Sequence, residues 1–393
     1  MKESAGRFPA MLRDSDGPSG DGFRYTIREI CQQPATWSET ARHLVPLSSL
    51  IAAALASRQR IVLTGSGSSQ YAGECAGPAV QERLRRPVEV VGGGDLLLNG
   101  KASVAGEPTL VVSLARSGES PESAAVVGTL LENEPRTHHL IITCNSEGKL
   151  IKAFAGNARV RAIDLGPLVN DRSLVMTSSF TNLVLGAMFL GWIERTDEFV
   201  RMVDRLDWAG RQLLATWPDS LHEWVSGDVG RIVFLGTGSR FGACREAALK
   251  VLEMTAGNIA SMAETYLGLR HGPMSFIDER TLVVGFLSSD PLIRNYERDL
   301  ILELNAKNLG ARKLIAGIGD PGAGLCHGQD LAIPYELPED MANDALTVLD
   351  AIVAQILGFH RSLWERLRPD SPSTTRVITR VVGDFPIYHD VGA

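Results

Sequence analysis

Residues 61–74 read IVLTGSGSSQYAGE, an aliphatic run that passes through glycines and hydroxyl side chains into a helix-like pattern. In a parallel α/β sheet, ligands bind beyond the carboxyl ends of the strands, where the next helix presents unpaired N–H groups to an anion. The stretch therefore predicts a buried strand and half of a phosphate cradle, with Ser66, Ser68 and Ser69 as donors. By itself it is equally compatible with a glycine-rich turn that binds nothing.

Similar short runs follow in the first half of the chain. They are rich in Val, Ile and Leu, end in Gly, Ser or Asn, and alternate with helical patterns: RIVLTG, PVEVVG, TLVVSLA, HLIITCN and VRAIDLG. Strands that are apolar on both faces and separated by helices indicate a parallel sheet covered on both sides. Before them, residues 23–59 have a helical pattern, with Pro34 opening a second helix.

The pattern then occurs a second time. GSGS at residues 65–68 aligns with GTGS at 236–239, an offset of 171, and TLVVSLA at 109 aligns with TLVVGFL at 281, an offset of 172. HLIITCNSEG and KLIAGIGDPG match at an offset near 173. Three matches in the same order predict two copies of one α/β domain. We expect a flexible tail (1–22), a helical segment (23–59), two domains (60–215 and 216–368) and a C-terminal tail (369–393).

A second hydroxyl-rich loop, LARSGESPES at 114–123, follows an early strand of the same repeat. The ends of these two strands are expected to be neighbours, so Arg116, Ser117 and Ser120 could face the same phosphate as the first loop. A third cluster, VMTSSFTN at 175–182, starts a helix and adds Thr177 and Ser178. Each cluster alone is typical of helix capping. The second repeat has LSSDPL instead, where Asp290 would repel an anion.

Composition excludes several classes of protein. The 393 residues carry a net charge of −7 with no basic stripe, which argues against nucleic acid as a partner. Five scattered cysteines without a C-x-x-C pair fit a reducing cytoplasm and give no zinc spacing. The polar N-terminus lacks the apolar core of a signal peptide. No apolar run approaches the length of about 20 residues that a membrane span needs, and SFTNLVLGAMFLGWIERTDE is predicted to be a buried helix.

The paired α/β repeats with G-[ST]-G-S and S-G-x-S at strand ends resemble the sugar isomerase (SIS) family, including the isomerase half of glucosamine-6-phosphate synthase. The segment EICQQP at 29–34 and the region AALKVLEMTAGNIASMAETYLGLRHGPMSFID at 247–278 extend the resemblance. Within the family, the chain is most similar to the AgaS-type isomerases and deaminases, over residues 24–372. The resemblance implies two tandem SIS domains, each a flavodoxin-like, three-layer αβα unit with a mainly parallel sheet.

The resemblance also implies the roles of particular residues. Glu253 matches the carboxylate that moves a proton between C1 and C2 of the open-chain sugar, a step that needs a base. His271 matches the histidine that assists ring opening, and in relatives it reaches the partner subunit's site, which implies a homodimer or a larger assembly. The five serines, Thr177 and Ser178 match the phosphate loops and the pocket segment. Glu264 matches the glutamate of the family's A-E-x-Y pattern, and a structural hydrogen bond explains it equally well. No metal or organic cofactor is implied.

Two departures from the synthase limit the reaction. There is no glutaminase domain to supply ammonia, and the tail VITRVVGDFPIYHDVGA has no lysine to form a Schiff base. The expected reaction is therefore the conversion of galactosamine 6-phosphate to tagatose 6-phosphate and ammonia, in the cytoplasm and away from membranes. The alternatives are a plain ketose/aldose isomerase and a glucosamine-6-phosphate deaminase. A sugar-phosphate-sensing binding protein ranks lower, because the chain keeps both Glu253 and His271.

Overall fold

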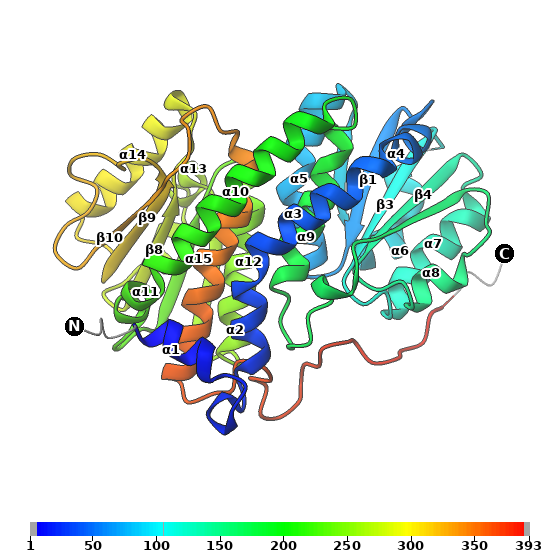
Figure 1. Ribbon diagram of the computed structural model, residues 1–393. Coiled ribbons are helices and arrows are strands. Elements are labelled where there is room, and N and C mark those ends of the chain that lie inside the picture. The colour runs from blue at the N-terminus through cyan, green and yellow to red at the C-terminus, as the bar shows by residue number, and fades with distance from the viewer. Residues whose placement is uncertain (1–5, 105, 389–393) are drawn as a thin grey trace.

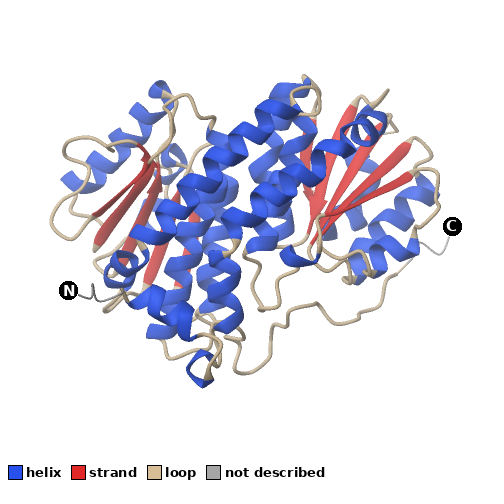
Figure 2. Cartoon of the chain, in the orientation of Figure 1, coloured by secondary structure: helices blue, strands red, loops and turns tan. Residues whose placement is uncertain are grey.

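The computed structural model describes residues 6–104 and 106–388, which form two α/β halves joined by a central layer of helices (Figure 1). Each half has a five-stranded, fully parallel sheet. Figure 2 shows the two sheets at opposite ends of the molecule, with helices covering their faces. The predicted fold class, two tandem α/β units with parallel sheets, is confirmed.

The first sheet has the strand order β2-β1-β3-β4-β5. Its strands are β1 (Arg60–Gly65), β2 (Val88–Gly92), β3 (Thr109–Ala115), β4 (Thr137–Thr143) and β5 (Val160–Asp164). The three strands β1, β3 and β4 lie in the middle and are almost wholly buried. Their side chains are apolar on both faces because helices cover both sides of the sheet. The helices of this half are α5 (Ser68–Leu84), α6 (Gly93–Val104), α7 (Pro121–Asn133), α8 (Lys149–Ala153) and α9 (Ser178–Met188).

The second sheet repeats this topology, with the order β10-β9-β8-β6-β7. Its strands are β6 (Arg231–Leu235), β7 (Ala260–Glu264), β8 (Thr281–Phe286), β9 (Arg312–Ile318) and β10 (Leu331–Tyr335). β6 and β8 occupy the places of β1 and β3, as the sequence repeat predicts. The helices of this half are α12 (Ser239–Met254), α13 (Tyr266–Leu269), α14 (Pro291–Ala306) and α15 (Asn343–Trp364).

The two halves meet where α5 packs against α12. A Cβ on Gly242 of α12 would lie 2.6 Å from the backbone nitrogen of Cys75 on α5, so only glycine allows this approach. Other helices of this layer are α2 (Arg24–Cys31), α3 (Gln33–Leu44), α10 (Thr196–Thr216) and α11 (Pro218–Val225), whereas α4 (Ser48–Leu55) lies against the first sheet. Pro34 lies in the first turn of α3, as predicted. Because α12 packs this closely against α5, the last turn of a helix from the second half reaches the carboxyl ends of the strands of the first sheet.

Helix α15 is long and apolar enough to cross a membrane by length and composition, but 94% of its most apolar stretch is buried inside the protein.

The segment 1–22 was expected to be a flexible tail, and its first five residues lie outside the described part. From Arg7 it is instead helical in α1 (Arg7–Asp14), because the buried Phe8 packs edge-on against Phe359 of α15 at 5.8 Å. The predicted buried helix after residue 178 is confirmed as α9.

Candidate active site

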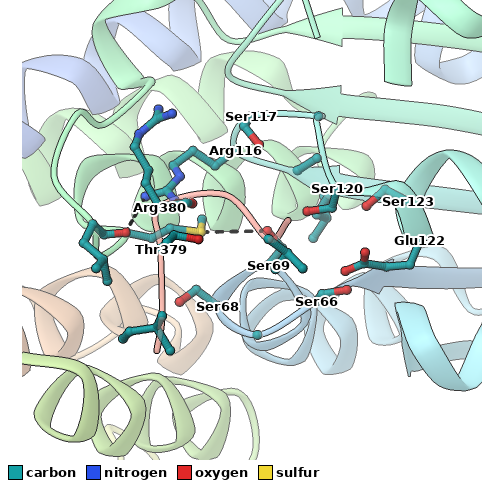
Figure 3. A pocket seen from close by; sticks show the side chains of 18 of the residues that line it. Ser66, Ser68, Ser69, Arg116, Ser117, Ser120, Glu122, Ser123, Thr379 and Arg380 are labelled. Carbon is teal, nitrogen blue, oxygen red and sulfur yellow. Dashed lines mark hydrogen bonds between the residues drawn. The ribbon is translucent and has the colours of Figure 1, made fainter. Parts of the chain in front are cut away.

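A cavity of about 290 Å³ lies at the carboxyl ends of β1 and β3, where the two sequence loops meet (Figure 3). The serines around it come from both loops: Ser66, Ser68, Ser69, Ser117, Ser120 and Ser123. The structure thus brings all five predicted serines to one site. Their function as phosphate ligands remains a prediction.

Backbone geometry makes this cavity suitable for an anion. Gly67 and Gly118 have φ of +57° and +63°, the left-handed region that favours glycine, and each turns its loop toward a helix start. Neither α5 nor α7 has a side chain capping its first turn. The N–H groups of Ser69 and Ser123 bond the carbonyls of Ser66 and Ser120, but the positive end of each helix dipole remains available to a ligand.

In the second half, the chain's own carboxylates occupy the corresponding positions. Asp290 caps α14 by accepting hydrogen bonds from the N–H groups of Leu292 and Ile293, at 2.8 and 3.0 Å. The buried Glu297 accepts a hydrogen bond from the backbone N–H of Ser288 at 2.6 Å. At the start of α14 the chain itself therefore satisfies these donors, which makes this loop less suited to an anion than its counterpart in the first half.

The second half contributes a carboxylate to the cavity. Glu253, on the last turn of α12, lines its wall, and its side chain is 22% exposed. A neighbouring cavity of about 480 Å³ shares Leu249, Glu253 and Ile378 with the first. Glu253 therefore lies between the serine-lined space and a second, more apolar space. A sugar whose phosphate sits among the serines would extend its other end toward Glu253.

A fully buried lysine holds Glu253 in place. Lys250, one turn earlier on α12, contacts the Glu253 carboxylate, and its Nζ lies 3.4 Å from Glu246 Oε1 and 3.2 Å from Ser68 Oγ. Burial alone would lower the pKa of Lys250, but the two carboxylates outweigh it and raise the pKa. Burial raises the pKa of Glu246 to about 7, and Lys250 opposes that shift. The lysine thus connects the Glu253 carboxylate on α12 with the serine loop that follows β1.

Arg116 is buried at the cavity wall, but its guanidinium binds backbone oxygens. It donates to the carbonyls of Leu174 (3.0 Å) and Arg380. Ile378, Thr379, Arg380 and Val382 of the C-terminal segment line the cavity, so this lysine-free tail forms one of its walls. Arg380 is fixed there by hydrogen bonds to Asp171 O (2.8 Å) and Asn170 Oδ1 (2.7 Å). Arg116 therefore holds the tail against the site.

Thr177 and Ser178 do not line the cavity. Both are fully buried, and the carboxylate of Asp171 accepts hydrogen bonds from the Thr177 N–H (2.8 Å) and the Ser178 hydroxyl. The same carboxylate accepts one from the Ser179 N–H at 2.7 Å. This cluster caps α9 and fixes the loop that carries Leu174 and Met176 into the cavity wall. The cluster therefore contributes to the site only by shaping this wall of the cavity.

His271 also lies away from this cavity. It follows α13 in the second half, is exposed on the surface, and lines no part of the cavity that contains Glu253. The nearby Glu264 accepts hydrogen bonds from the N–H and hydroxyl of Thr265, at 2.7 and 3.2 Å. That structural hydrogen bond was one of the two expected roles of Glu264.

Sequence reasoning missed four residues that form or support the site: Lys250, Glu246, Arg380 and Asp171. Only Lys250 and Glu246, two charged residues four positions apart in the stretch that contains Glu253, gave a local signal. Glu122, in the first turn of α7, also lines the cavity, and its Oε2 has no hydrogen-bond partner among the described residues. It offers an acceptor to a sugar hydroxyl.

Glu29 of the entry segment EICQQP links α2 to the site loop. Its carboxylate accepts hydrogen bonds from the backbone of Arg172 and from the N–H and hydroxyl of Ser173. Burial, and then the charge of Asp171, raise its pKa from 4.5 to about 7 against the effect of these hydrogen bonds. Near neutral pH this group therefore changes charge in the folded protein.

This shift predicts a pH dependence of stability. Between pH 4.5 and 7 the folded state keeps a proton on Glu29 that the unfolded chain has lost. The stabilisation is therefore present at low pH and is lost as pH rises through 7, by up to about 3 kcal/mol. We expect Glu29→Gln to flatten the fall in unfolding free energy between pH 5 and 8, measured by urea titration. Glu39→Gln, at an exposed position on α3, is the control and should keep the wild-type slope.

Comparison with known proteins places this geometry among sugar-phosphate enzymes. The SIS domain model matches residues 54–166 and 228–316. A protein of Escherichia coli named D-galactosamine-6-phosphate deaminase AgaS is 33% identical, over 93% of this chain and 95% of its own. A Shewanella protein of the same name is 32% identical, over 93% and 92%. The solved tagatose-6-phosphate ketose/aldose isomerase from Escherichia coli is 30% identical, with a TM-score of 0.82 over 88% of this chain and 95% of its own.

Proposed function

Because the chain belongs to the SIS-domain family and its relatives are named galactosamine-6-phosphate deaminases, it is an amino-sugar-phosphate deaminase/isomerase, and we propose galactosamine 6-phosphate as its substrate. The observation that carries the proposal is one cavity lined by six serines, including all five predicted ones, and by Glu253 from the other half. A phosphate site and a base in one cavity are what a sugar-phosphate isomerisation needs.

In the proposed mechanism the phosphate binds among the serines and the two open helix N-termini. Hydroxyl and N–H donors stabilise the dianion, and the buried cations Arg116 and Lys250 lie close to these donors. Binding at this remote group holds the reacting carbons near Glu253, so the binding energy is used for orientation. The tail wall formed by Ile378 and Thr379 limits access of water on one side.

Proton transfer is the step assigned to Glu253. In the open-chain aldose, its carboxylate takes the proton from C2 and delivers it to C1, through an enolamine. This leaves an imine at C2. Water adds to that carbon and the C–N bond breaks, giving the C2 ketone of tagatose 6-phosphate and ammonia. Lys250 keeps the carboxylate in position through the contact described above.

Ring opening is assigned to His271 of a second subunit. The exposed position of His271, away from the cavity that contains Glu253, is compatible with action in a partner's site. We therefore propose a homodimer. We also propose a cytoplasmic location, in keeping with five cysteines that are all unpaired, as expected in a reducing compartment.

The test is ammonia release from galactosamine 6-phosphate, with glucosamine 6-phosphate in parallel. We expect the galacto substrate to give the higher kcat/KM, with one ammonia formed per tagatose 6-phosphate. A preference for the gluco substrate would keep the mechanism and overturn the substrate.

A second candidate function is isomerisation without nitrogen chemistry, which is favoured by the similarity to the solved ketose/aldose isomerase from Escherichia coli. It uses the same cavity and the same proton transfer between C1 and C2. It would be established by interconversion of tagatose 6-phosphate and its aldose in the absence of ammonia release from either amino sugar.

A further inference from the structure

A second, smaller cavity lies at the opposite end of the first sheet from the active site. It has a volume of about 130 Å³ and is bordered by the end of α4, the residues before β1 and the starts of β4 and β5. The active-site serines follow the other ends of the strands, roughly 20 Å away at about 3.3 Å per residue. In Figure 1, α4 lies above this sheet, whereas the C-terminal segment passes below it. The two cavities are therefore separate.

The lining of this cavity is strongly basic. Apart from three alanines it consists of cationic or titratable nitrogen groups: Arg58, His138, His139, Arg159 and Arg161. No acidic residue of the described chain lines it. Arg159 donates to the carbonyls of Glu134 (3.1 Å) and Leu131, and Arg161 to those of Ala158 (3.2 Å) and Val160 (2.9 Å). Within residues 6–104 and 106–388, none of the three arginines forms an ion pair with a carboxylate.

Two buried nitrogens at the cavity lack partners among the described residues. One is Nε of Arg58, and the other is Nδ1 of His139, whose side chain is 1% exposed. The other ring nitrogen of His139 lies 3.4 Å from the Thr137 hydroxyl. Buried polar atoms are nearly always paired, so an orphan donor beside a cavity indicates a missing partner. Nε–H of Arg58 is a donor, so its partner must accept a hydrogen bond, whereas the role of His139 Nδ1 depends on the ring tautomer.

The electrostatics point to a negative charge. Burial, and then the charges of Arg58, Arg159 and Arg161, lower the pKa of His138. Burial and the charges of Arg159 and His138 lower the pKa of His139 to about 3, so this ring is neutral at physiological pH. Like charges held close together without a counter-charge repel one another, and an anion between them would relieve the repulsion.

We propose that this basic cavity is a second anion-binding site, which takes a phosphate-type oxyanion. The volume suits one tetrahedral oxyanion, with room at the mouth for the rest of a small phosphomonoester. Arg58 and Arg161 supply the charge, and His139 supplies a neutral ring nitrogen. The ligand is either free inorganic phosphate or the phosphoryl group of a metabolite. The site is independent of catalysis, because none of its residues lines the active-site cavity.

The experiment counts phosphate sites by isothermal titration of the full-length protein with inorganic phosphate at constant ionic strength. Arg58→Gln/Arg161→Gln removes the basic cavity, and Ser117→Ala/Ser120→Ala weakens the cradle. Arg159 is left unchanged because it holds the carbonyls of Leu131 and Glu134 in a distant segment, whereas Arg161 binds only carbonyls of its own segment. The control, Arg136→Gln, removes an exposed arginine near the same edge that donates to Gly106 O and does not line the cavity.

We expect two phosphate sites in the wild type and in Arg136→Gln, and one in each double variant. The cavity variant should keep its kcat/KM for the sugar phosphate within about twofold. Phosphate should raise the thermal midpoint of the wild type through both sites. The cavity variant should lose the part of this rise that comes from the basic cavity, and the cradle variant should keep that part. Arg161→Gln alone, at an exposed position, tests the site if the double variant folds poorly.

Glycerol 3-phosphate in place of inorganic phosphate distinguishes the two sources of ligand. Tighter binding of the ester at the basic cavity would indicate a metabolite, and tighter binding of inorganic phosphate a free anion. One phosphate site in the wild type that disappears in the cradle variant would overturn the proposal. Equal binding of phosphate in the cavity variant and the wild type, or equal effects of chloride and phosphate, would also overturn it.

Discussion

Glu253→Gln is expected to reduce kcat about 10²–10⁴-fold, the usual contribution of a positioned general base. Glutamine has nearly the same size as glutamate but cannot take the C2 proton. The neighbouring Lys250 keeps Glu246 as a partner, so the helix should remain folded. KM should change little, because the proposed phosphate ligands are the serines of the two loops, which the substitution leaves in place.

Two measurements separate a base from a binding group. The first is steady-state ammonia release, with Glu279→Gln, an exposed glutamate in the turn before β8, as the matched control. The second is exchange of the C2 proton with solvent deuterium, which the variant should no longer catalyse. A large rise in KM with kcat and proton exchange preserved would show that Glu253 binds substrate and that another group moves the proton.

The central strands and the serine loops could be predicted because their signals are local. β1, β3 and β4 are apolar on both faces, and the glycines and serines follow them directly in the sequence. The edge strands β7 and β10 were missed. β7, with the sequence ASMAE, is only partly buried, and β10 contains Pro334. Edge strands bury less apolar surface and tolerate proline, so their pattern is weak.

The rest of the site depends on contacts between distant parts of the chain. Lys250 reaches Ser68, 182 residues away, only because α12 packs against α5. The wall formed by Ile378 and Arg380 comes from a segment without regular structure, which carries no periodic pattern. Thr177 and Ser178 show the reverse case. Their local pattern matched a ligand-binding loop, but Asp171 uses their donors to cap α9.

The position of Glu253 depends in turn on a buried ion pair at the other end of α12. Arg240 binds Asp350 of α15 through two hydrogen bonds, 2.7 Å from Nε and 2.5 Å from Nη2, and both side chains are almost completely buried. Tyr335 donates to the same carboxylate at 2.8 Å. Burial raises the pKa of Asp350, and Arg240 opposes that shift. The arginine is therefore what allows a charged aspartate at this depth.

Arg240→Ala should lower the free energy of unfolding by about 3–5 kcal/mol, because it leaves Asp350 buried without its counter-charge. Urea unfolding followed by circular dichroism measures the change. The control is Arg245→Ala on the same helix, which removes a partly exposed pair with Glu74 and should cost no more than about 1 kcal/mol.

The pH dependence identifies the cause of this loss. Without Arg240 the folded-state pKa of Asp350 exceeds its unfolded value, so the folded state holds a proton that the unfolded chain releases as pH rises. The variant should therefore be less destabilised at pH 5 than at pH 8. Adding Asp350→Leu to an Arg240→Met background should recover at least half of the loss, since an apolar pair needs no counter-charge. A loss that is independent of pH and unchanged in the double variant would instead indicate a cavity left by the missing side chain.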